Sequence, residues 1–151
     1  MTANELMIRQ NFLNKVLLKD GDNELSKDLK VKIMRLRIKL SKVRKEFDED
    51  VQEAAKGFMP EGFQQLAQKQ DKTEEEQKLF NEQSAKLNDE YNAYVLKRSQ
   101  ETVDSIIDTK FTDAEYNEIL EVNAGNDVEI NGQKLSAPDF LEVFYSLFVE
   151  E

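Results

Sequence analysis

The chain of 151 residues contains no cysteine and no histidine. Without cysteine there is no disulfide framework and no thiolate nucleophile, which is typical of a cytosolic protein. Without histidine the commonest general base and the usual zinc ligand are both missing. Catalytic triads of the Ser–His and Cys–His kinds are therefore excluded, although a carboxylate- or lysine-based enzyme is not. We expect no enzymatic activity, no cofactor and no metal site.

Glycine and proline are scarce, with five and two residues, and tryptophan is absent. The glycines are scattered among predicted turns, so none forms a phosphate-binding loop. No apolar run approaches the about 20 residues that cross a bilayer. Residues 1–5 lack the basic and apolar regions of a signal peptide. We therefore expect a protein that is neither secreted nor embedded in a membrane.

One stretch, residues 26–56, has no glycine or proline and organises the rest of the chain. Its apolar residues recur at alternating steps of four and three, which is a helical seam of the heptad type. At 1.5 Å per residue this predicts a helix about 45 Å long. The seam consists of Leu29, Ile33, Leu36, Leu40, Val43 and Phe47.

The same helix has a second apolar face in its first half. Val31, Met34 and Ile38 lie opposite the seam at 100° per residue. A helix that is apolar on two sides is packed on two sides, so the pattern places it in the middle of a layer and not at the surface.

Charge is distributed unevenly along the chain. Residues 27–45 contain nine Lys or Arg and one acid, a balance of +8, whereas the whole chain carries −10 and the remainder therefore −18. This asymmetry disfavours general binding of nucleic acid. We expect the basic stretch to be neutralised within the chain by a later acidic helix, and the alternative is that it contacts a partner.

That acidic helix is predicted over residues 74–100, after a capping box formed by Thr73 and Glu76. It is long enough to run antiparallel to the first long helix as a helical hairpin. The connection carries the apolar residues Phe58, Met59 and Phe63. Either this loop folds back on the end of the hairpin, or it forms an exposed apolar tip that binds a partner.

Shorter elements are predicted at both ends of the chain. The capping box of Thr2 and Glu5 starts an apolar helix at Ala3, which we expect to run to Gly21, followed by a turn over residues 20–24. Residues 102–108 are compatible with a strand or with continuation of the acidic helix. The sequence shows no internal repeat.

The C-terminal region combines helices with a hairpin. Thr112 and Glu115 form a third capping box, and the dipeptide Asn131-Gly132 predicts a type I′ turn between strands at 128–130 and 133–135. Ser136 then caps a last helix, whose apolar stripe is typical of core packing. The stripe contains Phe140, Phe144 and Phe148.

The predicted fold is therefore mainly α, a long, coiled-coil-like antiparallel helical hairpin with a small C-terminal α+β lobe that contains a β-hairpin. We divide it into a helical domain over residues 1–101 and the lobe over residues 102–151, packed as one unit.

The order of these segments resembles that of small helical proteins from the structural and morphogenesis gene blocks of tailed bacteriophages. The likeness lies in an apolar first helix ending Leu17-Leu18-Lys19, a basic helix, an acidic helix, and the closing segments 128–132 and 140–144. It implies a virion-associated or assembly role, in the host cytoplasm or the virion, with no active site.

The leading hypothesis is a non-enzymatic structural or assembly protein that binds copies of itself or another protein. Its candidate interaction residues are Val31, Met34, Ile38, Phe58, Met59 and Phe63. The alternative is an acidic inhibitor or regulator that mimics nucleic acid and binds a basic groove. A third hypothesis, contact with nucleic acid through the basic stretch, is disfavoured by the net charge.

Overall fold

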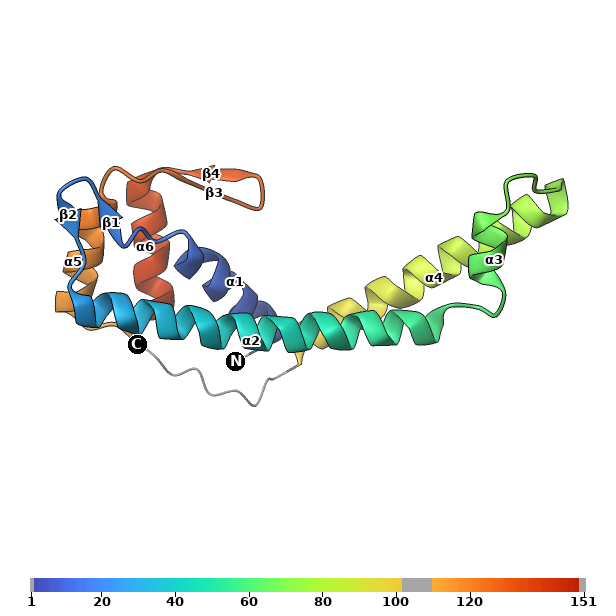
Figure 1. The fold of residues 1–151 in the computed structure, drawn as a ribbon, viewed down its shortest axis with the longest axis horizontal. Coiled ribbons are helices and arrows are strands. Elements are labelled where there is room, and N and C mark those ends of the chain that lie inside the picture. Colours follow the sequence, from blue (N-terminus) through green and yellow to red (C-terminus); the bar gives the residue numbers. More distant parts are fainter. Residues whose placement is uncertain (1, 102–109, 150–151) are drawn as a thin grey trace.

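The computed structural model describes residues 2–101 and 110–149. This part of the chain is mainly helical, with a long helical hairpin and a small α+β lobe, as the sequence predicts (Figure 1). The prediction for residues 102–108 lies outside the described residues. The elements are α1 (Ala3–Asn14), β1 (Lys19–Asp20), β2 (Asn23–Glu24), α2 (Lys27–Phe58), α3 (Phe63–Gln68), α4 (Glu74–Gln100), α5 (Asp113–Asn123), β3 (Val128–Ile130), β4 (Gln133–Leu135) and α6 (Ala137–Phe148).

Helix α2 is the longest element: α1, α5 and α6 lie beside its first half, whereas α4 meets it farther along and then diverges from it (Figure 1). Ser26 caps its first turn by accepting a hydrogen bond from the Leu29 backbone N–H. The predicted seam is buried along its length except for Val43, which is half-buried. The helix continues to Phe58 and does not stop at Gly57, which lies within its last turn.

Helix α1 begins where its capping box predicts but ends earlier. The Thr2 hydroxyl accepts from the Glu5 backbone N–H, and the Glu5 carboxylate accepts from the Thr2 N–H. The predicted end at Gly21 is wrong, because the helix stops at Asn14. Gly21, with φ of +59°, instead forms the turn between β1 and β2, which confirms the predicted turn but adds an unpredicted hairpin.

The end of α1 is held by a side chain from α2. The Arg37 guanidinium donates to the backbone carbonyls of Leu13, at 3.1 Å, and of Val16, at 2.6 Å. Carbonyls at a helix C-terminus lack partners within the helix and favour a nearby cation. Partial burial lowers the pKa of Arg37 from its ordinary value.

The same order of elements occurs twice, which corrects the expectation of no repeat. A Thr capping box, a helix, a two-stranded hairpin and a Ser-capped helix follow one another from Thr2 through Ser26 and again from Thr112 through Ser136. In both copies 24 positions separate the Thr from the Ser cap. The capping residues recur in both copies, whereas most other side chains differ, so the repeat becomes evident from the order of the helices and strands.

The second hairpin confirms its predicted turn. Val128 pairs with Leu135 and Ile130 with Gln133, and the two turn residues, Asn131 and Gly132, have φ of 53° and 79°. Two consecutive positive φ angles are what a type I′ turn requires.

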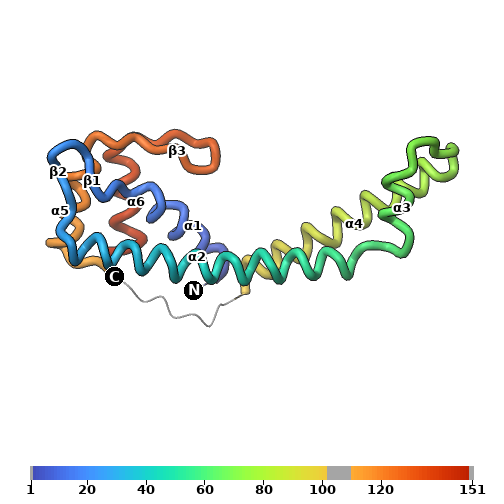
Figure 2. The backbone as a smooth tube through the Cα atoms, viewed as in Figure 1, coloured from blue at the N-terminus to red at the C-terminus, as the bar shows by residue number. Residues whose placement is uncertain are grey.

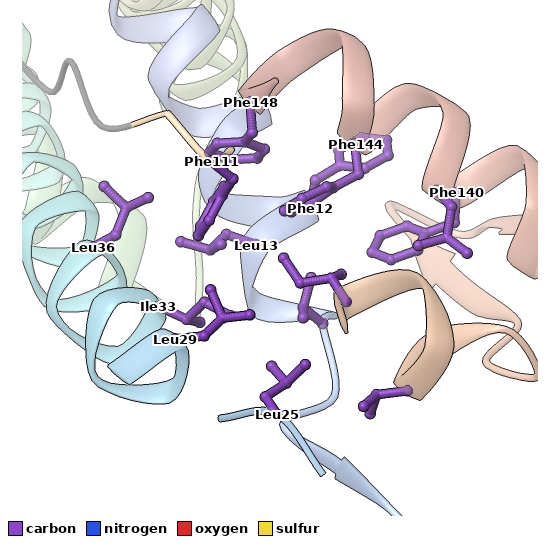
Figure 3. Close-up of a cluster of buried hydrophobic side chains, with 14 of the residues drawn as sticks. Phe12, Leu13, Leu25, Leu29, Ile33, Leu36, Phe111, Phe140, Phe144 and Phe148 are labelled. Carbon is purple, nitrogen blue, oxygen red and sulfur yellow. The ribbon is translucent and has the colours of Figure 1, made fainter. Parts of the chain in front are cut away.

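The main core lies between the first half of α2 and the helices α1, α5 and α6 (Figure 3). The predicted stripe on α6 is confirmed, since Phe140, Phe144 and Phe148 are each at most 1% exposed. The Phe12 ring of α1 stacks on the Phe140 ring with centroids 5.6 Å apart. The core therefore draws residues from both ranges into which the sequence is divided, 1–101 and 102–151.

Asn123 at the end of α5 is the one polar residue buried among the described residues, and it joins the two ends of the chain. Its Oδ1 accepts from the Leu17 N–H at 2.8 Å, and its Nδ2 donates to the carbonyls of Leu17, at 3.2 Å, and of Ile119, at 2.8 Å. The Asn123 side-chain amide thus pairs with both backbone groups of Leu17, as a neighbouring strand would, shortly after the end of α1.

Beyond the lobe, α4 returns from the far end and meets α2 near its middle (Figure 2). A second small core forms there from Phe47 and Val51 of α2 and half-buried Tyr91, Tyr94 and Val95 of α4. Asp50 of α2 accepts hydrogen bonds from the Tyr94 hydroxyl, at 2.8 Å, and from Arg98 Nε, at 2.7 Å. No residue of α3 or α4 is fully buried, so the far part of the hairpin is solvated.

Replacing the buried Asn123 with leucine should lower the free energy of unfolding by about 2–4 kcal/mol, because the N–H and C=O of Leu17 and the C=O of Ile119 lose their partner. Urea denaturation followed by circular dichroism measures this. The control is Asn117→Leu on the exposed face of the same helix, which should change stability by less than about 0.5 kcal/mol. Equal losses in the two variants would contradict the role of Asn123.

The contact between α2 and α4 should weaken in acid. Hydrogen bonds from Tyr94 and Arg98 lower the pKa of Asp50 below its ordinary value of 3.8. A lowered pKa means that the folded state favours the carboxylate, so its contribution to stability is present above pH 3.8 and is lost as the pH falls through the lowered value.

We therefore expect Asp50→Asn to lower the melting temperature at about pH 6, and we expect this effect to shrink as the pH falls below 3.8 and the wild-type carboxyl takes up a proton. Glu53→Gln, on an exposed acid of α2 paired only with Lys56, is the control and should have little effect at about pH 6. An Asp50→Asn effect that is independent of pH would show that the carboxylate charge is not the cause.

Candidate protein-interaction site

The second apolar face of α2 is exposed, which overturns the prediction that this helix lies in the middle of a layer. Val31 is 36%, Met34 51% and Ile38 68% exposed. The lobe covers only the seam side of α2, and the second core with α4 begins only at Phe47. We call these three residues the α2 stripe.

The spacing of the α2 stripe is that of a recognition helix. Its residues stand at positions i, i+3 and i+7, so they form one ridge along the helix. Single exposed apolar residues are normal on a protein surface, whereas an aligned row of large ones is typical of binding surfaces. Amphipathic helices that dock in a partner's groove use this same pattern of anchors.

The basic residues of α2 include an inward-facing and an outward-facing group. The inward-facing residues bond to other elements of the chain: Lys32 lies 2.8 Å from Glu115 of α5 and donates to the Lys110 carbonyl at 2.7 Å, while Arg37 donates to carbonyls at the end of α1. Burial opposes ionisation of Glu115, but hydrogen bonds from Lys32 and Thr112 lower its pKa overall.

The outward-facing group borders the α2 stripe. Lys27, Arg35 and Lys42 lie on or beside the same side of the helix at 100° per residue. None of the three forms an ion pair with any residue in the described parts of the chain. The α2 stripe is therefore an apolar ridge set in positive charge.

The expectation that the acidic helix neutralises the basic stretch is wrong for the described residues. Lys30 pairs with Glu24 and Lys32 with Glu115, neither of which belongs to α4. The ion pair between the two long helices runs the other way, from Arg98 of α4 to Asp50 of α2. The reason is register: α4 meets α2 beyond the end of its basic stretch.

The apolar residues between the long helices are half-buried against α4. The Phe58 ring contacts the Tyr94 ring edge-on, and the Phe63 ring stacks on the Phe80 ring at 5.6 Å. Met59, also half-buried, lines an open hollow of about 680 Å³ at the end of the hairpin. This placement favours the alternative in which the loop folds back on the hairpin.

The structure also forms a surface that sequence reasoning missed, which we call the α5–α6 groove. It has a volume of about 460 Å³ and is lined mainly by Tyr116, Leu120, Pro138, Leu141 and Tyr145, with Glu142 beside them. Leu120 is 40% and Tyr145 37% exposed. The sequence signal was weak, because each helix contributes only a few residues and the groove exists only where the two helices meet.

Tyr116 fixes the floor of this groove. Its hydroxyl donates to the Leu141 carbonyl at 3.0 Å, and its ring meets the Tyr145 ring edge-on with centroids 5.0 Å apart. Burial raises the pKa of Tyr116, so the ring stays neutral at physiological pH. The groove is thus a preformed apolar surface with an acidic neighbour.

Comparison with known proteins adds no further evidence, because no family model, curated protein or solved structure matches the chain. Residues 2–101 and 110–149 contain no cluster of three or more side chains suited to holding a metal ion. Within the same residues, no helix combines the length and apolarity needed to cross a bilayer.

The absence of native cysteine allows the exposure of the α2 stripe to be measured directly. We expect Ile38→Cys in dilute protein to react with a maleimide about as fast as in urea, and Ile33→Cys, on the buried side of α2, to react only on unfolding. Slow labelling of position 38 in a monomer would contradict the exposure and would show that another part of the chain covers the α2 stripe.

Proposed function

We propose that this protein is a non-catalytic structural or assembly protein that acts through protein contacts, in a bacteriophage virion or in the cytoplasm of its host. The phage setting follows from the resemblance in the layout of the chain. The observation that carries the assembly role is the α2 stripe, an exposed row of Val31, Met34 and Ile38 on the longest helix.

The α2 stripe leaves three aligned apolar side chains partly exposed to water. Burying a fully exposed side chain of this kind is worth about 1.5–3 kcal/mol, and these three residues are on average about half exposed, so covering all three supplies roughly half of that for each. The far side of the same helix already forms a complete core. The α2 stripe is therefore not required for folding and is available for association.

The proposed partner is a second copy of the chain. The α2 stripe is bordered by unpaired cations, and residues outside 27–45 carry a balance of −18. A second copy therefore brings ample negative charge to this basic surface. Charges of opposite sign at the rim of a contact steer association and fix its orientation, while the apolar ridge supplies most of the affinity.

Met34→Glu should abolish self-association without unfolding the chain. Position 34 is half exposed, so glutamate fits the helix and changes the free energy of unfolding by less than about 0.5 kcal/mol. Light scattering at high micromolar concentration should show an assembled wild type and a monomeric variant.

Leu96→Glu is the matched control, since Leu96 is a 60% exposed apolar residue on α4 away from the α2 stripe. It should leave the assembled species intact. A wild-type chain that stays monomeric at every concentration would overturn self-association. An assembled Met34→Glu variant with a native circular dichroism spectrum would exclude the α2 stripe as the contact.

A further inference from the structure

The chain has two exposed apolar surfaces, the α2 stripe and the α5–α6 groove. We propose that the α2 stripe of one copy docks in the α5–α6 groove of the next copy, in a head-to-tail contact. This inference rests on the proposed function and names the two surfaces that meet.

One surface is a ridge and the other is a hollow. The residues of the α2 stripe span seven positions, which is a ridge about 10 Å long on one side of a helix. The α5–α6 groove is formed by two packed helices and presents apolar side chains from both, among them Leu120 and Tyr145. A ridge with anchors at i, i+3 and i+7 lying between two helices is a recurring mode of protein recognition.

The two surfaces match in charge. Residues 110–149 contain eight carboxylates and two lysines, a balance of −6, against +8 for residues 27–45. Glu142 lines the groove, and Asp113 lies on the Leu120 side of α5, seven positions earlier, at 100° per residue. Neither of these acids forms an ion pair with another described residue. They can therefore meet the unpaired Lys27, Arg35 and Lys42.

The contact has to form between copies. The α2 stripe lies on the side of α2 opposite the seam, and it is the seam that packs against the lobe containing α5 and α6. A chain therefore cannot place its own stripe in its own groove. Two different surfaces that meet in this way make a heterologous contact, which continues from copy to copy and closes into a ring or extends as a filament.

The decisive experiment uses two variants, each with one surface blocked. Met34→Glu places an acid in the α2 stripe, and Leu120→Lys places a cation in the groove, so each is repelled by its unmodified partner surface. Both positions are exposed on helices, and Glu and Lys are good helix formers. Circular dichroism and melting temperature verify that each variant is folded, and light scattering gives the mass of each alone and of an equimolar mixture.

We expect each variant alone to be monomeric and the mixture to form a species of two chains, because the intact stripe of Leu120→Lys fits the intact groove of Met34→Glu. Higher salt should weaken this pair, since its rim charges are exposed. A mixture of Leu120→Lys with the Leu96→Glu control should also associate. It should form species of more than two chains, because Leu96→Glu retains both surfaces.

Other outcomes overturn the pairing in distinguishable ways. If folded Leu120→Lys assembles by itself like the wild type, the stripe contacts something other than the groove, and the proposed function stands while this inference fails. If both variants are monomeric and their mixture is too, the two surfaces do not bind each other. If the wild type is monomeric, the proposed self-association fails as well.

Discussion

Burial of one side of α2 is the constraint on which the rest of the structure depends. The seam from Leu29 to Leu40 is almost completely removed from water, and no single neighbouring segment covers it. Helix α1 precedes α2 in the chain, whereas α5 and α6 lie near the C-terminal end of the chain. The core therefore forms only when both ends of the chain pack against the first half of α2. The hydrophobic effect supplies this attraction but no direction.

A few polar contacts between these segments determine how the helices are placed relative to one another. Asn123 bonds both backbone groups of Leu17, and Arg37 bonds the carbonyl of Leu13 in the last turn of α1 and that of Val16 just after it. Each contact joins residues far apart in sequence and satisfies backbone groups that helices and strands leave open. Because an unpaired buried group is costly, such contacts select one arrangement of the helices from the many that would bury similar apolar area.

Helix α2 has an inner face, the seam, which forms the core, and an outer face, the α2 stripe, which is exposed. On its inner side Arg37 is bonded to the chain at the end of α1 and Lys32 to Glu115 of the lobe, whereas cations on its outer side border the α2 stripe. The α5–α6 groove is lined by apolar side chains with Glu142 beside them, and in the proposed contact it receives the α2 stripe of another copy. A chain with two complementary surfaces that cannot meet within one molecule is suited to repeated assembly, which connects the fold to the function we propose.

Local features were determined by the sequence itself. Capping boxes at Thr2, Thr73 and Thr112, the Asn-Gly turn and the two long helices follow from interactions between residues within a few positions of one another, and all are present. The periodicity of α2 identified its two apolar faces but not which of them the chain would cover. That depends on where α4 meets α2 and on how many elements reach it, and both are set by packing between distant segments. The end of α1, the bonds of Asn123, the partners of the basic residues and the α5–α6 groove likewise arise only when the two ends of the chain come together, because each of them is a property of two or more elements at once.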